Sequence, residues 1–423
     1  MIDDPWRQAL WGGDHNLLQH LINTEIPPKV LQNVSLFIYN LYQQVALNPE
    51  LRNKREQVNA RINQLAPVLN FARSQMSWGE QKYSDLALLQ FIRINGGLAI
   101  ALGAGSSIPA GAPNWSSLVK GLLSIALKDG HEVTVQDRIV EDSSVDIKRR
   151  VVKVERLTDQ QVELAKKIVG QINDNSADSE ILKEGAQLCA DLFKESLFQH
   201  ITSILYANTI GPGSIHEVVA KLAQPQKLPL HNVTAPGWSG IINYNFDSLI
   251  IDALEKYGIP YVFYCMRNGK YEQYTLKGES TNLMQKVIYL HGFTPRQSFF
   301  DIAGMEFVFS TRQYAEIYGE NETIIDFVKN NYLLNPLSIV IYVGCSFTDS
   351  EMNNLLKKAI ERYPYRFHYA LLKLPDEFIE NSYLYDDENE ELLKLNEKYN
   401  RIGIQPIWIS DYSEIPDLLL KLT

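Results

Sequence analysis

Residues 98–115 read LAIALGAGSSIPAGAPNW, an apolar run that breaks into a glycine-rich turn. Leu98–Leu102 is apolar without alternation, which is typical of a short parallel strand covered on both faces. Gly103 and Gly105 then permit a positive φ and a close approach of a ligand to the backbone. The amides at the start of the next helix would present the positive end of its dipole. The stretch therefore predicts a turn that binds a pyrophosphate, and a plain strand-to-helix connection is the alternative.

Apolar runs of strand length recur through the rest of the chain. They lie at residues 240–244, 261–265, 287–290, 339–343, 367–372 and 404–409. Helical patterns follow several of them, at residues 248–257, 350–362 and 414–420. This alternation predicts an α/β fold with a doubly wound, Rossmann-like parallel sheet and helices on both faces.

Two regions depart from this alternation. Residues 1–85 read as a helical N-terminal module, with a third helix expected over residues 51–71. The module is either a packing extension of the main domain or a surface for oligomerisation or partner docking. The main domain is expected over residues 86–423, with a largely helical insertion at about 128–207 that lies over the nucleotide site. Within the insertion, residues 133–154 fit a hairpin or a frayed helix.

The amino-acid composition argues against several classes of protein. The chain of 423 residues has a net charge of -10 with dispersed Lys and Arg, so the basic footprint of a nucleic-acid-binding protein is missing. Cys189, Cys265 and Cys345 lie far apart, which argues against a disulfide framework and a four-cysteine zinc site, and we expect no metal. The N-terminus lacks the features of a signal peptide, and no run reaches the ~18 apolar residues of a membrane span. We expect a cytoplasmic protein.

Polar residues follow four of the predicted strands. They are the turn 103–107, Asn245 with Asp247, His291 with Gly292, and Gly344 with Ser346 and Asp349. Each cluster alone has a structural explanation, because an asparagine or aspartate can cap a helix and a lone histidine can satisfy a core hydrogen bond. Ligands of an open α/β sheet bind beyond the carboxyl ends of its strands. Four clusters at successive strand ends therefore predict one ligand site.

The order of these motifs resembles that of the sirtuin-like NAD-binding family. The pattern Gly-Ala-Gly-x-Ser-x-x-Ala-Gly-x-Pro-x-Trp over residues 103–115 is similar to the nucleotide-binding opening of that family. NYNFD at 243–247 resembles its Thr-x-Asn-Tyr-Asp segment, with asparagine where threonine is usual. His-Gly at 291–292 resembles its catalytic histidine motif, and Gly-Cys-Ser at 344–346 its Gly-x-Ser turn. The resemblance extends over about residues 86–423.

The resemblance implies that NAD is the substrate and assigns roles to the motif residues. The pyrophosphate and neighbouring parts of NAD would lie on Gly103, Ala104, Gly105, Ser107, Pro113 and Trp115, and the adenosine side on Gly344, Ser346 and Asp349. Asn245 would orient the nicotinamide ribose and the attacking water. Asp247 would fix that loop or contact the ribose and carboxamide, and His291 would act as general base.

One departure from the family points to a branch within it. The zinc-binding cysteines of protein-deacetylating sirtuins are absent. In this respect the sequence resembles bacterial defence effectors that hydrolyse NAD. The implied function is an antiphage NAD glycohydrolase that releases nicotinamide and ADP-ribose and depletes NAD. A non-catalytic NAD or ADP-ribose sensor and an NAD-dependent protein deacylase stay open as alternatives. The resemblance also implies a homo-oligomer and a regulatory partner, such as a ring ATPase or a phage-derived activator.

Overall fold

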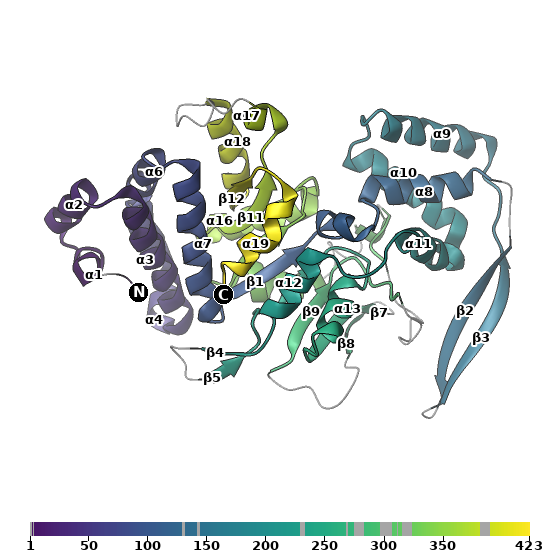
Figure 1. Ribbon diagram of the computed structural model, residues 1–423, viewed down its shortest axis with the longest axis horizontal. Helices are drawn as coiled ribbons and strands as arrows, with labels where there is room; N and C mark the ends of the chain where they lie inside the picture. Colours follow the sequence, from purple (N-terminus) through teal and green to yellow (C-terminus); the bar gives the residue numbers. More distant parts are fainter. Residues whose placement is uncertain are drawn as a thin grey trace.

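The computed structural model describes residues 2, 4–128, 132–141, 144–228, 233–267, 270–274, 283–296, 307–310, 312–314, 324–380 and 390–423. An eight-stranded sheet forms its centre, in the order β12-β11-β10-β1-β6-β9-β7-β8 (Figure 1). Neighbouring strands are parallel except for the pair β7 and β8. The strands are β1 (Leu98–Leu102), β6 (Ile241–Asn243), β7 (Tyr261–Arg267), β8 (Lys270–Tyr274), β9 (Gln285–Tyr289), β10 (Ile339–Val343), β11 (His368–Lys373) and β12 (Ile404–Ile409). The predicted α/β fold with a doubly wound sheet is confirmed.

Strand β1 lies inside the sheet, between β6 and β10. Its five residues are all buried because helices cover both faces. Leu98 and Ile100 contribute to the core on one face, and Ala99 to the core on the other. The uninterrupted apolar run in the sequence is therefore the consequence of burial on both sides.

The first face of the sheet is covered by helices from both ends of the chain. They include α3 (Pro27–Leu47), α7 (Trp78–Ile94), α12 (Ser214–Leu222), α13 (Leu249–Lys256) and α19 (Ile415–Leu420). Their side chains form one continuous core with strand residues, and Trp6 and Phe37 of the N-terminal module belong to it. The module thus packs on the main domain, and α7 passes residue 85 without interruption.

The N-terminal module contains more breaks than its sequence pattern predicts. It begins with α1 (Asp4–Gly12) and α2 (His15–Thr24), which precede the long α3. The prediction of a single helix over residues 51–71 is wrong. The chain forms three helices there, α4 (Pro49–Asn53), α5 (Arg55–Asn63) and α6 (Ala66–Ser74). Pro67 lies in the first turn of α6. A proline cannot continue a preceding helix, since it lacks the N–H and its ring clashes with an earlier carbonyl.

The second face is covered by C-terminal helices. They are α15 (Ile324–Val328), the π-helical turn η4 (Lys329–Leu333), α16 (Ser350–Arg362), α17 (Asp376–Glu380) and α18 (Glu390–Asn400). Strand β8 is antiparallel to β7 and forms one edge of the sheet. The sequence pattern does not predict this strand. In the part of the chain that the structure describes, no helix is long and apolar enough to cross a membrane.

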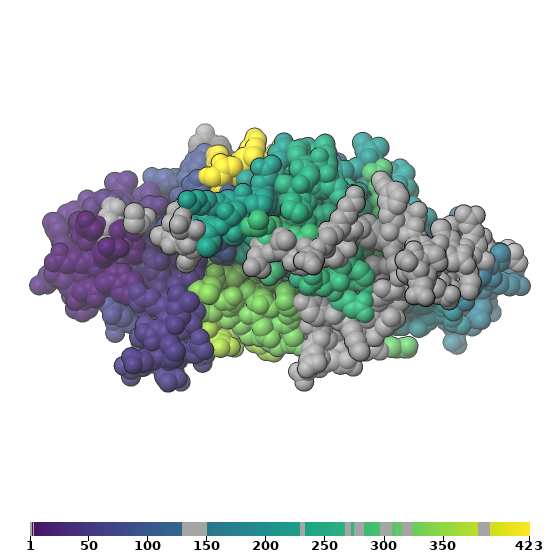
Figure 2. Space-filling model, turned by 90° about the horizontal axis from the view of Figure 1, so that it is seen from below, coloured from purple at the N-terminus to yellow at the C-terminus, as the bar shows by residue number. Residues whose placement is uncertain are grey.

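The insertion forms a layer of its own beside the sheet. It contains an antiparallel hairpin of β2 (Glu132–Glu141) and β3 (Ser144–Lys153). Of the two alternatives predicted for residues 133–154, the hairpin is therefore confirmed and the frayed helix is wrong. Helices α9 (Asp159–Asn173), α10 (Ser179–Phe193) and α11 (Leu197–Leu205) pack with α8 (Trp115–Ala126) around a third core. The N-terminal module and this layer lie at opposite ends of the molecule (Figures 1 and 2).

Candidate active site

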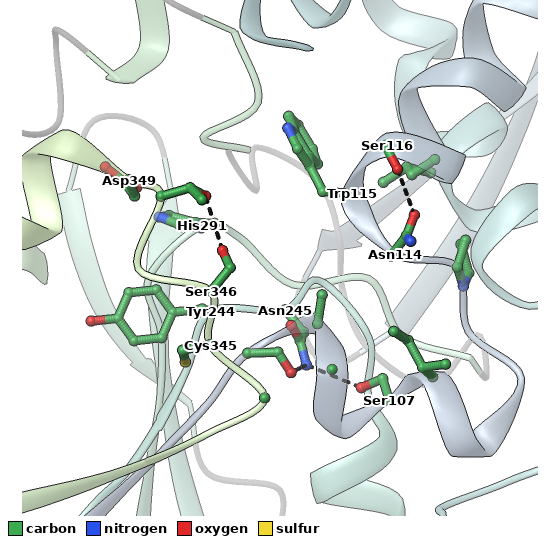
Figure 3. A pocket seen from close by; sticks show the side chains of 18 of the residues that line it. Ser107, Asn114, Trp115, Ser116, Tyr244, Asn245, His291, Cys345, Ser346 and Asp349 are labelled. Carbon is green, nitrogen blue, oxygen red and sulfur yellow. Dashed lines mark hydrogen bonds between the residues drawn. The ribbon is translucent and has the colours of Figure 1, made fainter. Parts of the chain in front are cut away.

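A cavity of about 530 Å³ opens beyond the carboxyl ends of β1, β6, β9 and β10. From β1 the chain goes first to β6 on one side and later to β10 on the other, so the cavity lies where the strand order reverses. Its volume is in the range of small-molecule sites. All twelve residues that the sequence predicts for the site line this cavity: Gly103, Ala104, Gly105, Ser107, Pro113, Trp115, Asn245, Asp247, His291, Gly344, Ser346 and Asp349 (Figure 3).

Two glycine-containing turns touch at the floor of the cavity. A Cβ on Gly103 would lie 2.5 Å from the carbonyl oxygen of Gly344, and a Cβ on Gly105 would lie 2.9 Å from the Cα of Gly344. Gly344 has a φ of +71°, and a Cβ there would collide with the amide of Ser106. Neither Gly103 nor Gly105 uses the positive φ that glycine permits. These glycines are needed because the two turns pack against each other.

The backbone amides of the first turn are largely engaged within the protein. The amide of Gly103 donates to Val343 at 2.9 Å and that of Gly105 donates to Gly344 at 3.0 Å. The turn continues into two short 3₁₀ helices, η1 (Ala104–Ser106) and η2 (Ile108–Ala110), and the α-helix begins only at Trp115. The start of α8, at Asn114, Trp115 and Ser116, nevertheless lines the cavity. The turn shapes a wall of the cavity, and an anion there needs further donors.

Three side chains form a buried hydrogen-bond network beside that wall. The Asn245 amide Nδ2 donates to Ser107 Oγ at 3.0 Å and to the Gly103 carbonyl at 3.0 Å (Figure 3). Ser107 Oγ donates to Asp247 Oδ2 at 2.8 Å. Asp247 Oδ1 accepts from the amide of Leu249 at 3.1 Å. The network fixes Asn245 and Asp247 against the turn that carries Ser107.

Burial controls the protonation of this network. It raises the pKa of Asp247 to about 6, against the lowering effect of the hydrogen bonds from Ser107 and Leu249. His216, whose Nε2 lies 3.4 Å from Ser107 Oγ, is also buried, and burial lowers its pKa to about 4. At neutral pH Asp247 is therefore a carboxylate and His216 an uncharged imidazole.

His291 follows β9 and is 8% exposed. Its ring lies 5.6 Å from that of Tyr244 and 5.3 Å from that of Tyr314, measured between centroids. Burial lowers the pKa of His291, while the Asp349 charge and a hydrogen bond to the backbone of Tyr244 act to raise it. The imidazole is consequently neutral at physiological pH and can accept a proton.

The second turn ends in a capped helix. Asp349 is the N-cap of α16, where its carboxylate accepts from the amides of Glu351 at 2.9 Å and Met352 at 3.3 Å. The hydroxyls of Ser346 and Thr348 lie 2.9 Å apart. Ser346 and Asp349 thus line the cavity from a segment that the start of α16 holds in place.

Trp115 begins α8 on the opposite wall. Asn114 caps this helix by accepting from the amide of Ser117 at 2.8 Å. The indole ring of Trp115 meets the ring of Phe309 edge-on, with centroids 4.9 Å apart. It faces the same space as His291 in Figure 3.

Sequence reasoning missed several residues that line the cavity, notably Lys183 and Tyr314. Lys183 comes from α10 of the insertion, and its Nζ lies 5.0 Å from the ring centroid of Tyr314. Tyr314 lies far along the chain from the end of β9, the strand that precedes it. Lys183 lies in an amphipathic helix. Lys183 has no local motif that distinguishes it from an ordinary packing or surface residue.

The residues described hold no group of three or more His, Cys, Asp or Glu placed to bind a metal ion. Cys189 and Cys265 are buried away from each other in separate cores, and Cys345 lines the cavity. Burial raises the pKa of Cys345 to about 12, so its sulfur is a thiol at neutral pH.

Comparison with known proteins identifies a domain in part of the chain. A search of curated proteins found no match. Residues 239–401 match the model of the SIR2-like domain. The matched range contains Asn245, His291 and the Gly344 turn, whereas β1 and its glycine turn precede it. The C-terminal region of the chain therefore contains a SIR2-like domain, which implies an activity that involves NAD.

Proposed function

We propose that this protein hydrolyses NAD to nicotinamide and ADP-ribose. The observation that carries the proposal is the convergence of Asn245, Asp247 and His291 on one cavity of a SIR2-like domain. A protein that only binds a dinucleotide has no need of a buried carboxylate and a neutral imidazole in the same space. Both groups are what a hydrolytic reaction at the nicotinamide ribose requires.

Cleavage of the bond between nicotinamide and ribose needs little acid catalysis. The bond between ribose C1′ and the nicotinamide nitrogen breaks, and its electron pair neutralises the pyridinium charge of the leaving group. Positive charge then develops on the ribose, where the Asp247 carboxylate would stabilise it. Water adds its oxygen to C1′ and gives its proton to His291, which is neutral before the reaction. Asn245 would orient the ribose and this water.

The remaining predicted residues would hold the rest of NAD. The pyrophosphate would lie along the first turn, at Gly103, Ala104, Gly105 and Ser107, with Pro113 and Trp115 on the same wall. The adenosine side would lie on Gly344, Ser346 and Asp349. The nicotinamide ribose would then lie beside Asn245 and His291, as the proposed reaction requires. No metal takes part in the proposed reaction.

We further propose that the reaction serves antiphage defence through depletion of NAD. The resemblance to bacterial defence effectors supports this role. An enzyme of this kind must be restrained in a healthy cell, so we propose control through a homo-oligomer or through a regulatory partner such as a ring ATPase or a phage-derived activator. The N-terminal module and the insertion lie at opposite ends of the molecule and are the surfaces on which such control would act.

The test is to incubate the purified protein with NAD, alone and with lysate of phage-infected cells, and to quantify nicotinamide and ADP-ribose. We expect His291→Ala and Asn245→Ala to reduce turnover at least about 100-fold, as for loss of a general base or of substrate orientation. His20→Ala, at an exposed position of α2, is the matched control. Thermal melts of each variant separate lost chemistry from lost folding.

The outcomes separate the alternatives. NAD binding without product from the wild type in either condition would favour the sensor. Release of nicotinamide only in the presence of an acylated lysine peptide would favour the deacylase. Full activity of His291→Ala would show that the assignment of the base is wrong.

A further inference from the structure

Lys183 is the only Lys or Arg among the described residues that line the cavity. The acidic side chains that line it are Asp247 and Asp349. A dinucleotide brings two further negative charges on its pyrophosphate. The amides of Gly103 and Gly105 already donate to backbone carbonyls. A phosphate-binding wall built this way lacks positive charge, and Lys183 is the side chain able to supply it.

The position of Lys183 is fixed by its own helix. The residue is 7% exposed and lies on the side of α10 that faces the cavity. Two residues later, α10 packs tightly on α8, because a Cβ on Gly185 would lie 3.0 Å from Val119 Cγ1. The ammonium group is therefore held at the cavity wall and does not swing freely in solvent.

The ammonium has weak partners in the absence of a ligand. Lys183 Nζ lies 3.0 Å from Glu180 Oε1, yet the Glu180 side chain is 71% exposed, so water screens this pair. The other partner is the face of the Tyr314 ring, 5.0 Å from Nζ. A doubly charged pyrophosphate would be a stronger partner than either, since a buried cation gains most from a charged acceptor.

We propose that Lys183 binds the pyrophosphate of the dinucleotide in this cavity, an inference that rests on the proposed function. The insertion then contributes a substrate-binding residue and does more than cover the site. Because α10 belongs to the core of the insertion and the glycine turns belong to the sheet, the ligand would join the two layers directly.

Calorimetry with two probes tests this assignment: ADP-ribose, which carries the pyrophosphate, and adenosine, which does not. We expect Lys183→Gln to weaken ADP-ribose binding about 10- to 100-fold, as for a lost hydrogen bond to a charged group, and to leave adenosine binding within about twofold. Lys183→Arg should retain most of the affinity for ADP-ribose. Lys166→Gln is the matched control, because Lys166 forms the same type of pair with Glu163 on exposed α9.

A second variant tests the inference without altering a buried group. Glu180→Gln removes the competing carboxylate from an exposed position, so we expect ADP-ribose to bind about two- to fivefold tighter. Equal loss of ADP-ribose and adenosine binding in Lys183→Gln, or no loss of either, would overturn the inference alone. A wild-type protein that binds ADP-ribose no more tightly than adenosine would also overturn the inference, whereas the proposed function is overturned only when NAD yields no product.

Discussion

The carboxyl group of Asp247 is buried and accepts two hydrogen bonds, yet burial still raises its pKa to about 6. Its ordinary pKa is 3.8, so the folded state binds this proton more tightly than the unfolded state does. The stability that Asp247 contributes is therefore present below about pH 4 and is lost as the pH rises towards 6. The difference corresponds to about 3 kcal/mol at neutral pH. The fold keeps a charged carboxylate in the cavity at this cost.

We expect Asp247→Asn not to lose this stability as the pH rises, because an amide does not titrate. The measurement is the free energy of unfolding in urea at pH 4 and pH 7.5. Relative to the wild type, the variant should gain about 2.4 kcal/mol between the two values. Asp159→Asn, at an exposed position of α9, is the control substitution. A difference between variant and wild type that is the same at both pH values would contradict the assignment.

The network around Asp247 also shows which parts of the site a sequence can reveal. Asn245 and Asp247 stand in one short segment directly after a strand, so their arrival at the cavity follows from topology. The sequence predicts Ser107 as part of the turn, but its hydrogen bonds to both residues depend on how the turn packs. Lys183 reaches the cavity through the packing of α10 on α8, which no local pattern encodes.

Among the elements, the two glycine turns depend on each other. Gly344 needs its positive φ, and it also has no room for a Cβ against Ser106. We expect Gly344→Ala to destabilise the protein by about 2–5 kcal/mol, from left-handed strain and overpacking together. Gly258 has a φ of +65°, and no atom lies within 4 Å of the place that a Cβ would take, so Gly258→Ala should cost only about 1–2 kcal/mol. Urea unfolding of both variants measures the difference, and equal losses would refute the contact between the turns.

The elements also differ in how well their sequence predicts them. Strands β10 and β12 begin and end where the sequence predicts them, and all their residues are buried. The run of β10 is apolar throughout, whereas Gln405 interrupts that of β12. Strand β8 escapes prediction because Lys270–Tyr274 is polar and pairs only at an edge. The helix expected over residues 51–71 fails for a different reason. Its apolar spacing continues across Pro67, but the backbone hydrogen bonds cannot.

At the scale of the whole molecule, the N-terminal module and the sheet are joined by polar links as well as by a shared core. Tyr42 donates to the carbonyl of Pro364 at 2.9 Å, and Lys82 pairs with Glu414 at 2.7 Å. Arg93 of α7 donates to the carbonyls of Leu222 and Leu422. These links connect helices of the first hundred residues to α12 in the middle of the chain and to its C-terminal part.

We therefore expect the module and the sheet to unfold as one cooperative unit. Phe37→Ala removes a fully buried ring from the shared core and should destabilise the whole protein by about 3–5 kcal/mol. Phe71→Ala, which removes a ring that is 49% exposed in the same module, should cost far less. Urea transitions followed by tryptophan fluorescence and by far-ultraviolet circular dichroism should coincide. Two separate transitions would show that the module folds independently.

The contact between the turns at Gly103 and Gly344 has a consequence for how a cell makes this protein. The turn at Gly103 is translated long before the turn at Gly344, so a ribosome-bound chain lacks a wall of the cavity until β10 has emerged. With the proposed activity, a growing chain would therefore be inactive until the second turn has packed on the first. Destruction of NAD would become possible only after β10 has joined the sheet beside β1, and an oligomer or partner that restrains the enzyme would then find the completed cavity.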